Sequence, residues 1–101
     1  MQYAFRTKMI GANKDKHGTS YLRITVKSMD YDYIMKHGSP AYFKNMKITR
    51  DNNDTITVDA PKLAKGPTVR DYTSHYVAVP IKEIREHGLL PNEPVNVVVE
   101  W

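Results

Sequence analysis

The chain has 101 residues, of which 41% are hydrophobic and 26% are charged, and its formal net charge is +4. This balance suits one folded domain with a modest core and excludes a disordered chain. The absence of cysteine excludes disulfides and thiolate metal sites. No apolar run approaches the roughly 20 residues that cross a bilayer, and the opening MQYAFRTKMIG is no secretion signal, so we expect a soluble cytoplasmic protein.

Positive charge is concentrated at the start of the chain. Residues 1–27 hold six Lys and Arg against one acidic residue, whereas residues 28–61 carry a net charge of −1 and residues 62–101 of zero. A basic segment beside a balanced remainder favours an anionic partner, most commonly nucleic acid. The same charges also suit a surface that only keeps the protein in solution.

Two strands and a helix are predicted first. The aromatic and β-compatible segments 3–10 and 21–27 predict strands, and the polar, glycine-containing segment 11–20 predicts the loop between them. Ser28 is suited to cap a short helix, which Gly38 would end.

The middle of the chain predicts a β-hairpin and a linker. Residues 41–51 and 55–60 read as strands, and DNND at 51–54 has the composition of the turn between them. The segment 61–67, PKLAKGP, contains two prolines and a glycine and is the best linker candidate.

The last third predicts a strand, a helix and a strand. Residues 68–80 are β-rich, with a kink near Asp71–Ser74, and Pro80 fits the first turn of a helix that Gly88 ends. Glu83 and Glu86 would face outward from this helix. The residues expected to face the core are Ile81, Ile84, Leu89, Val95, Val97 and Val99.

Both halves share one order of elements: a loop with basic residues, a strand, a short helix ending in His-Gly, a turn and a strand. The clearest identity is IMKHG at 34–38 against IREHG at 84–88. A repeat this small cannot bury its own apolar face, so the two must pack together. We expect one domain, 1–101, with sub-repeats 1–60 and 68–101.

The segment VAVPIKEIREHGLLPNEPVNVVVE resembles the AbrB/SpoVT/MazE swapped-hairpin family, and KHGTSYLRITVKSMDYDYIMKHG resembles it less closely. The matching features are Val79-Pro80, the KEIRE helix, Gly88-Leu89 and the valine-rich last strand. The chain departs from the family where Lys27 replaces a proline, Tyr72 replaces a loop glycine, and Glu93-Pro94 replaces Gly-Asp.

The resemblance implies an α+β, mainly β, fold: a swapped-hairpin barrel with two short helices, in which the tandem repeat forms an internal pseudo-dimer. Family members bind DNA through basic residues of the loop before the helix and through its flanking strands, and others are antitoxins. The matching positions in this chain are Lys14, Lys16, His17, Thr19, Ser20, Arg23, Arg70, Thr73, Ser74 and His75. The second unit lacks a final hairpin strand, and the open edge could be covered by another copy in a homodimer.

The chemistry of these residues suits phosphate contact. Lysine supplies a mobile charge, arginine can grip phosphate with two hydrogen bonds, and hydroxyl groups donate to phosphate oxygens. The alternatives are a solvated hairpin tip for Lys14, Lys16 and Arg23, neutralisation of Arg70 by the adjacent Asp71, and ordinary loop composition for the hydroxyl residues.

The motifs and residue spacings of the chain do not favour a metal site, a cofactor site or an enzyme active site. The histidines, at 17, 37, 75 and 87, show no spacing typical of a zinc site, and we expect no metal and no cofactor. His37 and His87 precede helix-ending glycines and suit the negative end of a helix dipole. Phosphate-binding loops and nucleophile motifs are absent, so we expect no enzyme.

The sequence therefore predicts a small DNA-binding protein, a transcriptional regulator or a DNA-coating protein, docking on duplex DNA through basic loops. The alternative is a protein-binding module of antitoxin or inhibitor type. Such a module would expose the Asp30–Tyr33 stretch or present Val95–Trp101 as an edge strand. A third possibility is stacking of unpaired bases on strand aromatics, which requires Tyr21 or Tyr42 to be exposed.

Overall fold

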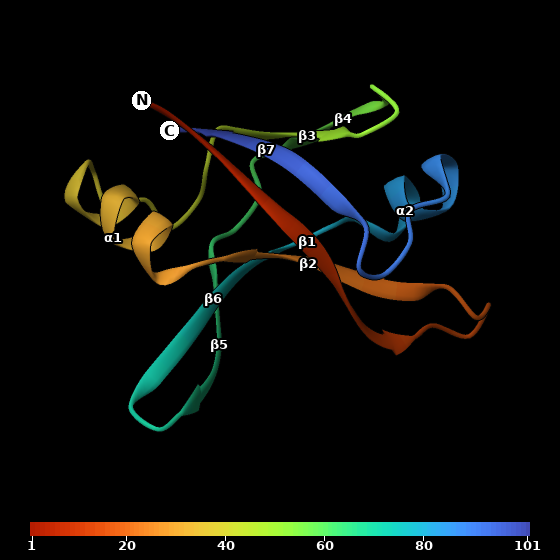
Figure 1. Ribbon diagram of the computed structural model, residues 1–101, viewed down its shortest axis with the longest axis horizontal. Coiled ribbons are helices and arrows are strands. Elements are labelled where there is room, and N and C mark those ends of the chain that lie inside the picture. Colours follow the sequence, from red (N-terminus) through yellow and green to blue (C-terminus); the bar gives the residue numbers. More distant parts are fainter.

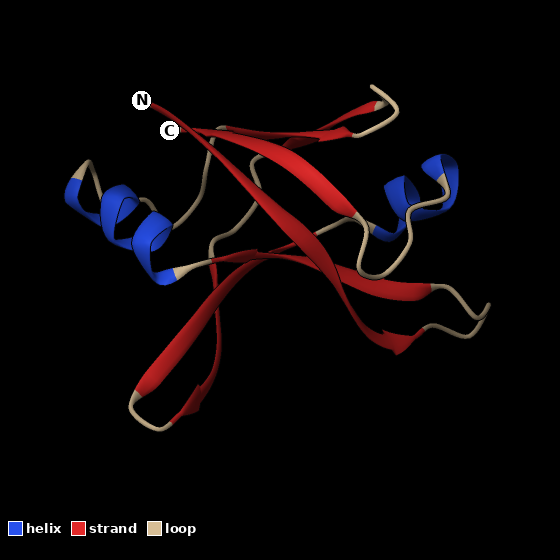
Figure 2. Cartoon of the chain, in the orientation of Figure 1, coloured by secondary structure: helices blue, strands red, loops and turns tan.

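The computed structural model describes residues 1–101, except for the side chain of Ala12. Over this range the chain is mainly β with two short helices, so the predicted α+β, mainly β, class is confirmed (Figures 1 and 2). The elements are β1 (Gln2–Lys14), β2 (Ser20–Val26), α1 (Ser28–Lys36), β3 (Asn45–Arg50), β4 (Thr55–Asp59), β5 (Ala64–Val69), β6 (Tyr72–Ala78), α2 (Ile81–His87) and β7 (Pro94–Glu100).

The seven described strands form one antiparallel sheet in the order β4-β3-β7-β1-β2-β6-β5. The long strand β1 joins its two halves, because residues 2–8 pair with β7 whereas residues 9–14 pair with β2. The sheet leaves β4 and β5 at its edges, so these strands form no closed barrel.

Strand β7 lies inside the sheet, between β3 and β1. The edge that we expected to remain open beside Val95–Trp101 is therefore filled by the N-terminal half of β1. This finding corrects the sequence argument for a homodimer, since the missing strand is supplied by the same chain. It also removes the edge that a protein partner would have used.

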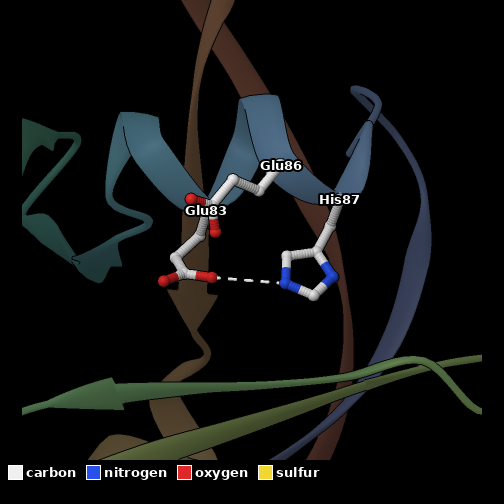
Figure 3. Close-up of side chains that lie close together, drawn as sticks. All are labelled: Glu83, Glu86 and His87. Carbon is white, nitrogen blue, oxygen red and sulfur yellow. Dashed lines mark ion pairs between the residues drawn. The ribbon is translucent and has the colours of Figure 1, made fainter.

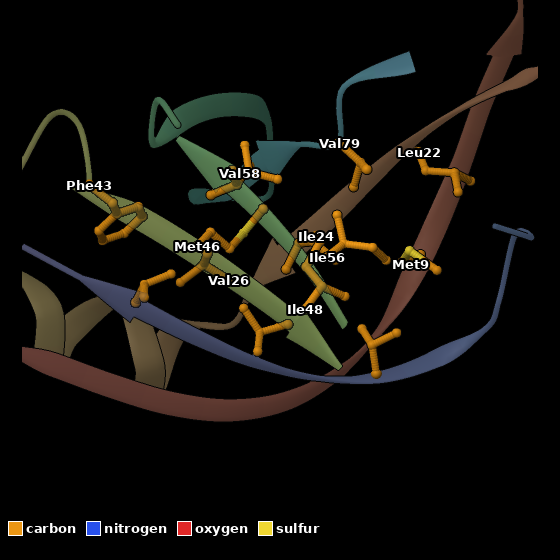
Figure 4. Close-up of a cluster of buried hydrophobic side chains, with 14 of the residues drawn as sticks. Met9, Leu22, Ile24, Val26, Phe43, Met46, Ile48, Ile56, Val58 and Val79 are labelled. Carbon is orange, nitrogen blue, oxygen red and sulfur yellow. The ribbon is translucent and has the colours of Figure 1, made fainter. Parts of the chain in front are cut away.

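The core lies on the concave side of the sheet (Figure 4). Val95, Val97 and Val99 are fully buried, as their alternation predicted, and Ile48 lies opposite Val97 in the register of β3 and β7. Each fully buried aliphatic side chain contributes about 1.5 to 3 kcal/mol of burial free energy. The helices contribute through Ile34, Ile84 and their neighbours, and the predicted burial of Ile84 and Leu89 is confirmed.

Three local predictions were wrong in detail. Strand β1 continues to Lys14 through a bulge, so part of the expected loop 11–20 pairs with β2. Residues 64–67, expected within the linker, belong to β5. Helix α1 begins at Ser28, and its N-cap position is held by Lys27 in an extended conformation. Pairing with a neighbouring strand outweighed the polar and proline-rich composition of the first two segments.

The expected kink in the second half is a tight hairpin turn. Arg70 and Asp71 have φ values of 50° and 64°, and β5 and β6 pair on either side of them. Two successive residues with positive φ match the right-handed twist of a two-residue hairpin. Neither residue is glycine, so the sequence lacks the residue that usually indicates such a turn.

Two units of the form β-β-α-β are interleaved. The first unit comprises β1, β2, α1 and β3, and the second comprises β5, β6, α2 and β7. Their second strands pair with each other, as do their last strands. Each helix lies against the hairpin of the other unit, through the ion pair of Arg85 with Asp15 and the stacking of Tyr31 on His75.

Candidate nucleic-acid interface

The tip of the β1–β2 hairpin presents the cations of the first predicted loop. Lys14 ends β1, Lys16 and His17 lie in the following turn, and all three are exposed. The Asp15 carboxylate accepts the backbone N–H groups of His17 and Thr19 at 3.0 and 2.9 Å, which fixes the turn. Burial alone would raise the pKa of Asp15, but these hydrogen bonds and a guanidinium from α2 lower it below its usual range.

Thr19 and Ser20 lie where this hairpin meets α2. The guanidinium of Arg85 donates to Asp15 and, from Nε at 3.5 Å, to the Thr19 hydroxyl. Ser20 is paired with Lys14 in the sheet. Both predicted residues line a hollow of about 380 Å³ between the hairpin and the C-terminal end of α2. They therefore belong to the junction of the two units.

The polar groups of the second predicted loop bond within their own hairpin. The hydroxyl oxygens of Thr68 and Thr73 lie 2.7 Å apart, and the Ser74 hydroxyl donates to the Pro67 carbonyl oxygen at 3.4 Å. Arg70 is exposed at the turn. Two of the predicted donors are thus already engaged in holding the turn.

His75 belongs to the contact between the two units. Its ring stacks on Tyr31 with 3.6 Å between the ring centroids. Burial, aided by the positive charge of Lys65, lowers the pKa of His75. The uncharged form is therefore favoured, and this residue is a poor phosphate ligand at neutral pH.

The two predicted loops do not lie together. Figure 1 shows the β1–β2 tip beside α2 and the β5–β6 tip below α1, on opposite sides of the molecule. Arg70 is consequently separated from Lys14 and Lys16. The two predicted loops therefore do not form one continuous surface, because the crossed hairpins point away from each other.

Arg23 lies on the convex face of the sheet, away from the core. Its guanidinium carbon is 4.5 Å from the centroid of the Tyr76 ring, within the range of a cation–π contact. In the sheet it lies between Ile10 of β1 and Ala78 of β6. The stacked ring leaves the edge of the guanidinium free to donate hydrogen bonds.

A basic hollow of about 520 Å³ lies on the same face, at the crossing of β1 and β2. Of the described residues that line it, none is acidic. Arg6 bonds to Asp51 at 3.1 Å and to Asn96 at 3.2 Å. Among the described residues, Lys8 and Lys27 make no ion pair. The lining residues are Arg6, Thr7, Lys8, Ile10, Thr25, Lys27 and Pro94.

The alternation of residues along β1 is a sequence signal for this hollow. Along β1 the buried Thr7 and Met9 alternate with the exposed Arg6, Lys8 and Ile10, so one face of the strand is basic. The two-residue period of a strand predicts this separation. The contribution of Lys27 could not be foreseen, because it depends on how β2 crosses β1.

Aromatic side chains are also available at the surface. Tyr21 is 47% exposed and Tyr42 is 60% exposed. This exposure meets the condition for base stacking, although Tyr42 lies outside the β1–β2 surface, in the segment before β3. Tyr3, by contrast, packs against the core.

Comparison of the chain with protein-family models, curated proteins and solved structures gave no match. None of the described helices has the length and apolar character needed to cross a membrane.

Proposed function

We propose that this protein docks on duplex DNA through the convex face of β1 and β2, as a transcriptional regulator or a DNA-coating protein. The observation that carries the proposal is the basic hollow, in which Lys8 and Lys27 face solvent without a carboxylate among the lining residues. Phosphate oxygens would neutralise these charges, and release of counterions would supply most of the affinity.

Further exposed lysines lie at the hairpin tip, at the end of the same two strands and beyond the bulge in β1. Arg6, Lys8 and Lys14 lie along one strand, and Arg23 lies on the neighbouring strand. Lysines would act as point charges, while Arg23, oriented by Tyr76, would grip a phosphate with two donors. Such contacts position a protein on a duplex without selecting a base sequence.

The proposal includes a swapped-hairpin relationship of the AbrB/SpoVT/MazE type, with a barrel left open between β4 and β5. Three features support it: the repeated β-β-α-β order, the pairing of β2 with β6, and the contact of each helix with the hairpin of the other unit. One chain would then supply the two units that such proteins usually assemble from two chains.

The test is fluorescence anisotropy of a labelled random duplex across a salt series. The Lys8→Ala/Lys27→Ala variant should bind more weakly, and its slope of log K against log salt should be shallower by about 1.8, since each lost phosphate contact removes about 0.9. The control, Lys62→Ala/Lys82→Ala, loses the same charge outside the hollow and should keep the slope.

Equal effects of the two variants, or no binding at low salt, would refute docking through the hollow. The matching single strand is measured in parallel. Preference for it would favour stacking on exposed aromatics such as Tyr21 over duplex docking.

A further inference from the structure

Three side chains with metal-binding atoms converge on α2, away from the basic hollow. Glu83, Glu86 and His87 each offer one ligand atom, and these atoms lie within 4.8 Å of one another (Figure 3). Their spacing of three and four residues places them on one side of the helix. The spacing of the histidines alone could not indicate this cluster, because two of its three candidate ligands are carboxylates.

The imidazole of His87 is held from outside this cluster. Its Nδ1 lies 2.8 Å from Oδ2 of Asp54, where the N–H can donate to the carboxylate. Arg50 in turn donates to Asp54 at 3.2 Å. Nε2 is thereby directed toward Glu83, whose Oε2 lies 3.4 Å away. A carboxylate that fixes the remote nitrogen of a ligating histidine is a recurrent feature of metal sites.

The other helix of the repeat provides an internal comparison. His37 occupies the place of His87 in the shared Ile-x-x-His-Gly sequence, but Tyr33 and Lys36 stand where α2 has Glu83 and Glu86. Nδ1 of His37 lies 2.7 Å from the carbonyl oxygen of Tyr33. The two carboxylates that accompany the histidine on α2 therefore have no counterpart on α1.

We propose that α2 binds one divalent transition-metal ion through Nε2 of His87 and one carboxylate oxygen each from Glu83 and Glu86. A mixed nitrogen and oxygen ligand set suits Zn²⁺, Co²⁺ or Ni²⁺, whereas Mg²⁺ and Ca²⁺ prefer oxygen alone. Water would complete the coordination. The competing pair of Lys82 and Glu86, at 4.0 Å between exposed side chains, is too weak to prevent binding.

Metal binding would fasten α2 to the β3–β4 turn. Asp54 lies in that turn and contacts His87, so a rigid imidazole links the two segments. An ion that binds only the folded chain raises its stability in proportion to the logarithm of the free ion concentration. This role is independent of DNA docking, because the hollow and this cluster share no residue.

The test uses the full chain, freed of metal by a chelator and then dialysed. Calorimetric titration with Zn²⁺ should give one site per chain, and Zn²⁺ should raise the unfolding temperature. His87→Gln and Glu86→Gln should each weaken binding at least tenfold. Glu86 is exposed, so its variant is expected to fold even if His87→Gln does not. His37→Gln is the matched control and should bind as the wild type does.

Failure of the wild type to bind Zn²⁺ would overturn the proposal. So would binding that survives unchanged in both site variants, or binding that is lost in His37→Gln. Titration with Co²⁺ supplies a second measurement, since its visible absorption should indicate a nitrogen and oxygen ligand set and should disappear in the Glu86→Gln variant.

Discussion

Ile24 of β2 lies directly opposite Val77 of β6, and both side chains are completely buried. This pair joins the two β-β-α-β units where their second strands lie side by side. Neither unit covers its own apolar face, so the pair belongs to the contact on which both units depend.

Truncation at this contact should destabilise the whole protein. Ile24→Ala removes buried methyl groups and leaves a cavity, at an expected cost of about 2 to 5 kcal/mol in the free energy of unfolding. Thr25→Ala, on the opposite face of β2, should cost less than about 1 kcal/mol. Urea unfolding followed by circular dichroism measures both. Similar losses for the two variants would contradict the assigned faces of β2.

The hydroxyl of Tyr3 should ionise at a higher pH than that of an ordinary tyrosine. It donates to Oδ1 of Asp30 at 2.5 Å, and this hydrogen bond, with burial and the Asp30 charge, raises the pKa of Tyr3 to about 12. A raised pKa contributes stability below the ordinary value of about 10, and this contribution is lost as the pH rises from 10 to 12. The free energy of unfolding of the wild type should therefore exceed that of Tyr3→Phe by less and less as the pH rises through this range.

Unfolding by urea at a series of alkaline pH values measures that difference, with Tyr42→Phe as the control for an exposed tyrosine. If the difference in the free energy of unfolding between wild type and Tyr3→Phe stayed constant up to pH 12, the hydrogen bond to Asp30 would not be formed in solution.

The carboxylate of Asp54 should contribute stability that acid removes. Its hydrogen bond with His87, with the added effect of Arg50, lowers the pKa of Asp54. A lowered pKa gives stability above the ordinary carboxyl range near 4, which is lost as the pH falls through the folded value. The metal-free wild type should thus lose more stability than Asp54→Asn between pH 6 and pH 3. Parallel losses in urea unfolding would contradict this assignment.

The hairpin tips should differ in their contribution to DNA binding. Lys14→Ala/Lys16→Ala should weaken duplex binding and reduce the salt slope by up to about 1.8. Arg70→Ala should change the slope little, because Arg70 lies at the opposite tip. Anisotropy under the conditions used for the hollow variants measures both, and a larger effect of Arg70→Ala would place the interface on the β5–β6 side.

Local chemistry made several elements predictable. Alternating valines in the last strand gave its buried face, and the DNND turn gave the hairpin of β3 and β4. Gly88, with φ of 63°, ends α2 as expected, because a left-handed residue after a helix favours glycine. These signals involve residues close in the chain, and their physical causes are steric fit and short-range hydrogen bonds.

Long-range pairing decided the rest. The backbone of β7 offers the same donors and acceptors to any strand, so its sequence could not reveal that β1 would fill its open edge. The same limit applied to the candidate metal site, since Asp54 reaches His87 only after segments distant in the chain have packed together.

The sequence by itself determined the class of fold, most of its helices and strands, and the excess of positive charge in the first 27 residues. Only the tertiary structure decided which hairpin lies against which helix, and therefore that the two predicted loops point apart while β1 and β2 form one basic surface. The physical reason is that side-chain periodicity fixes which face of an element is buried, whereas the choice of partner depends on the packing of the whole chain.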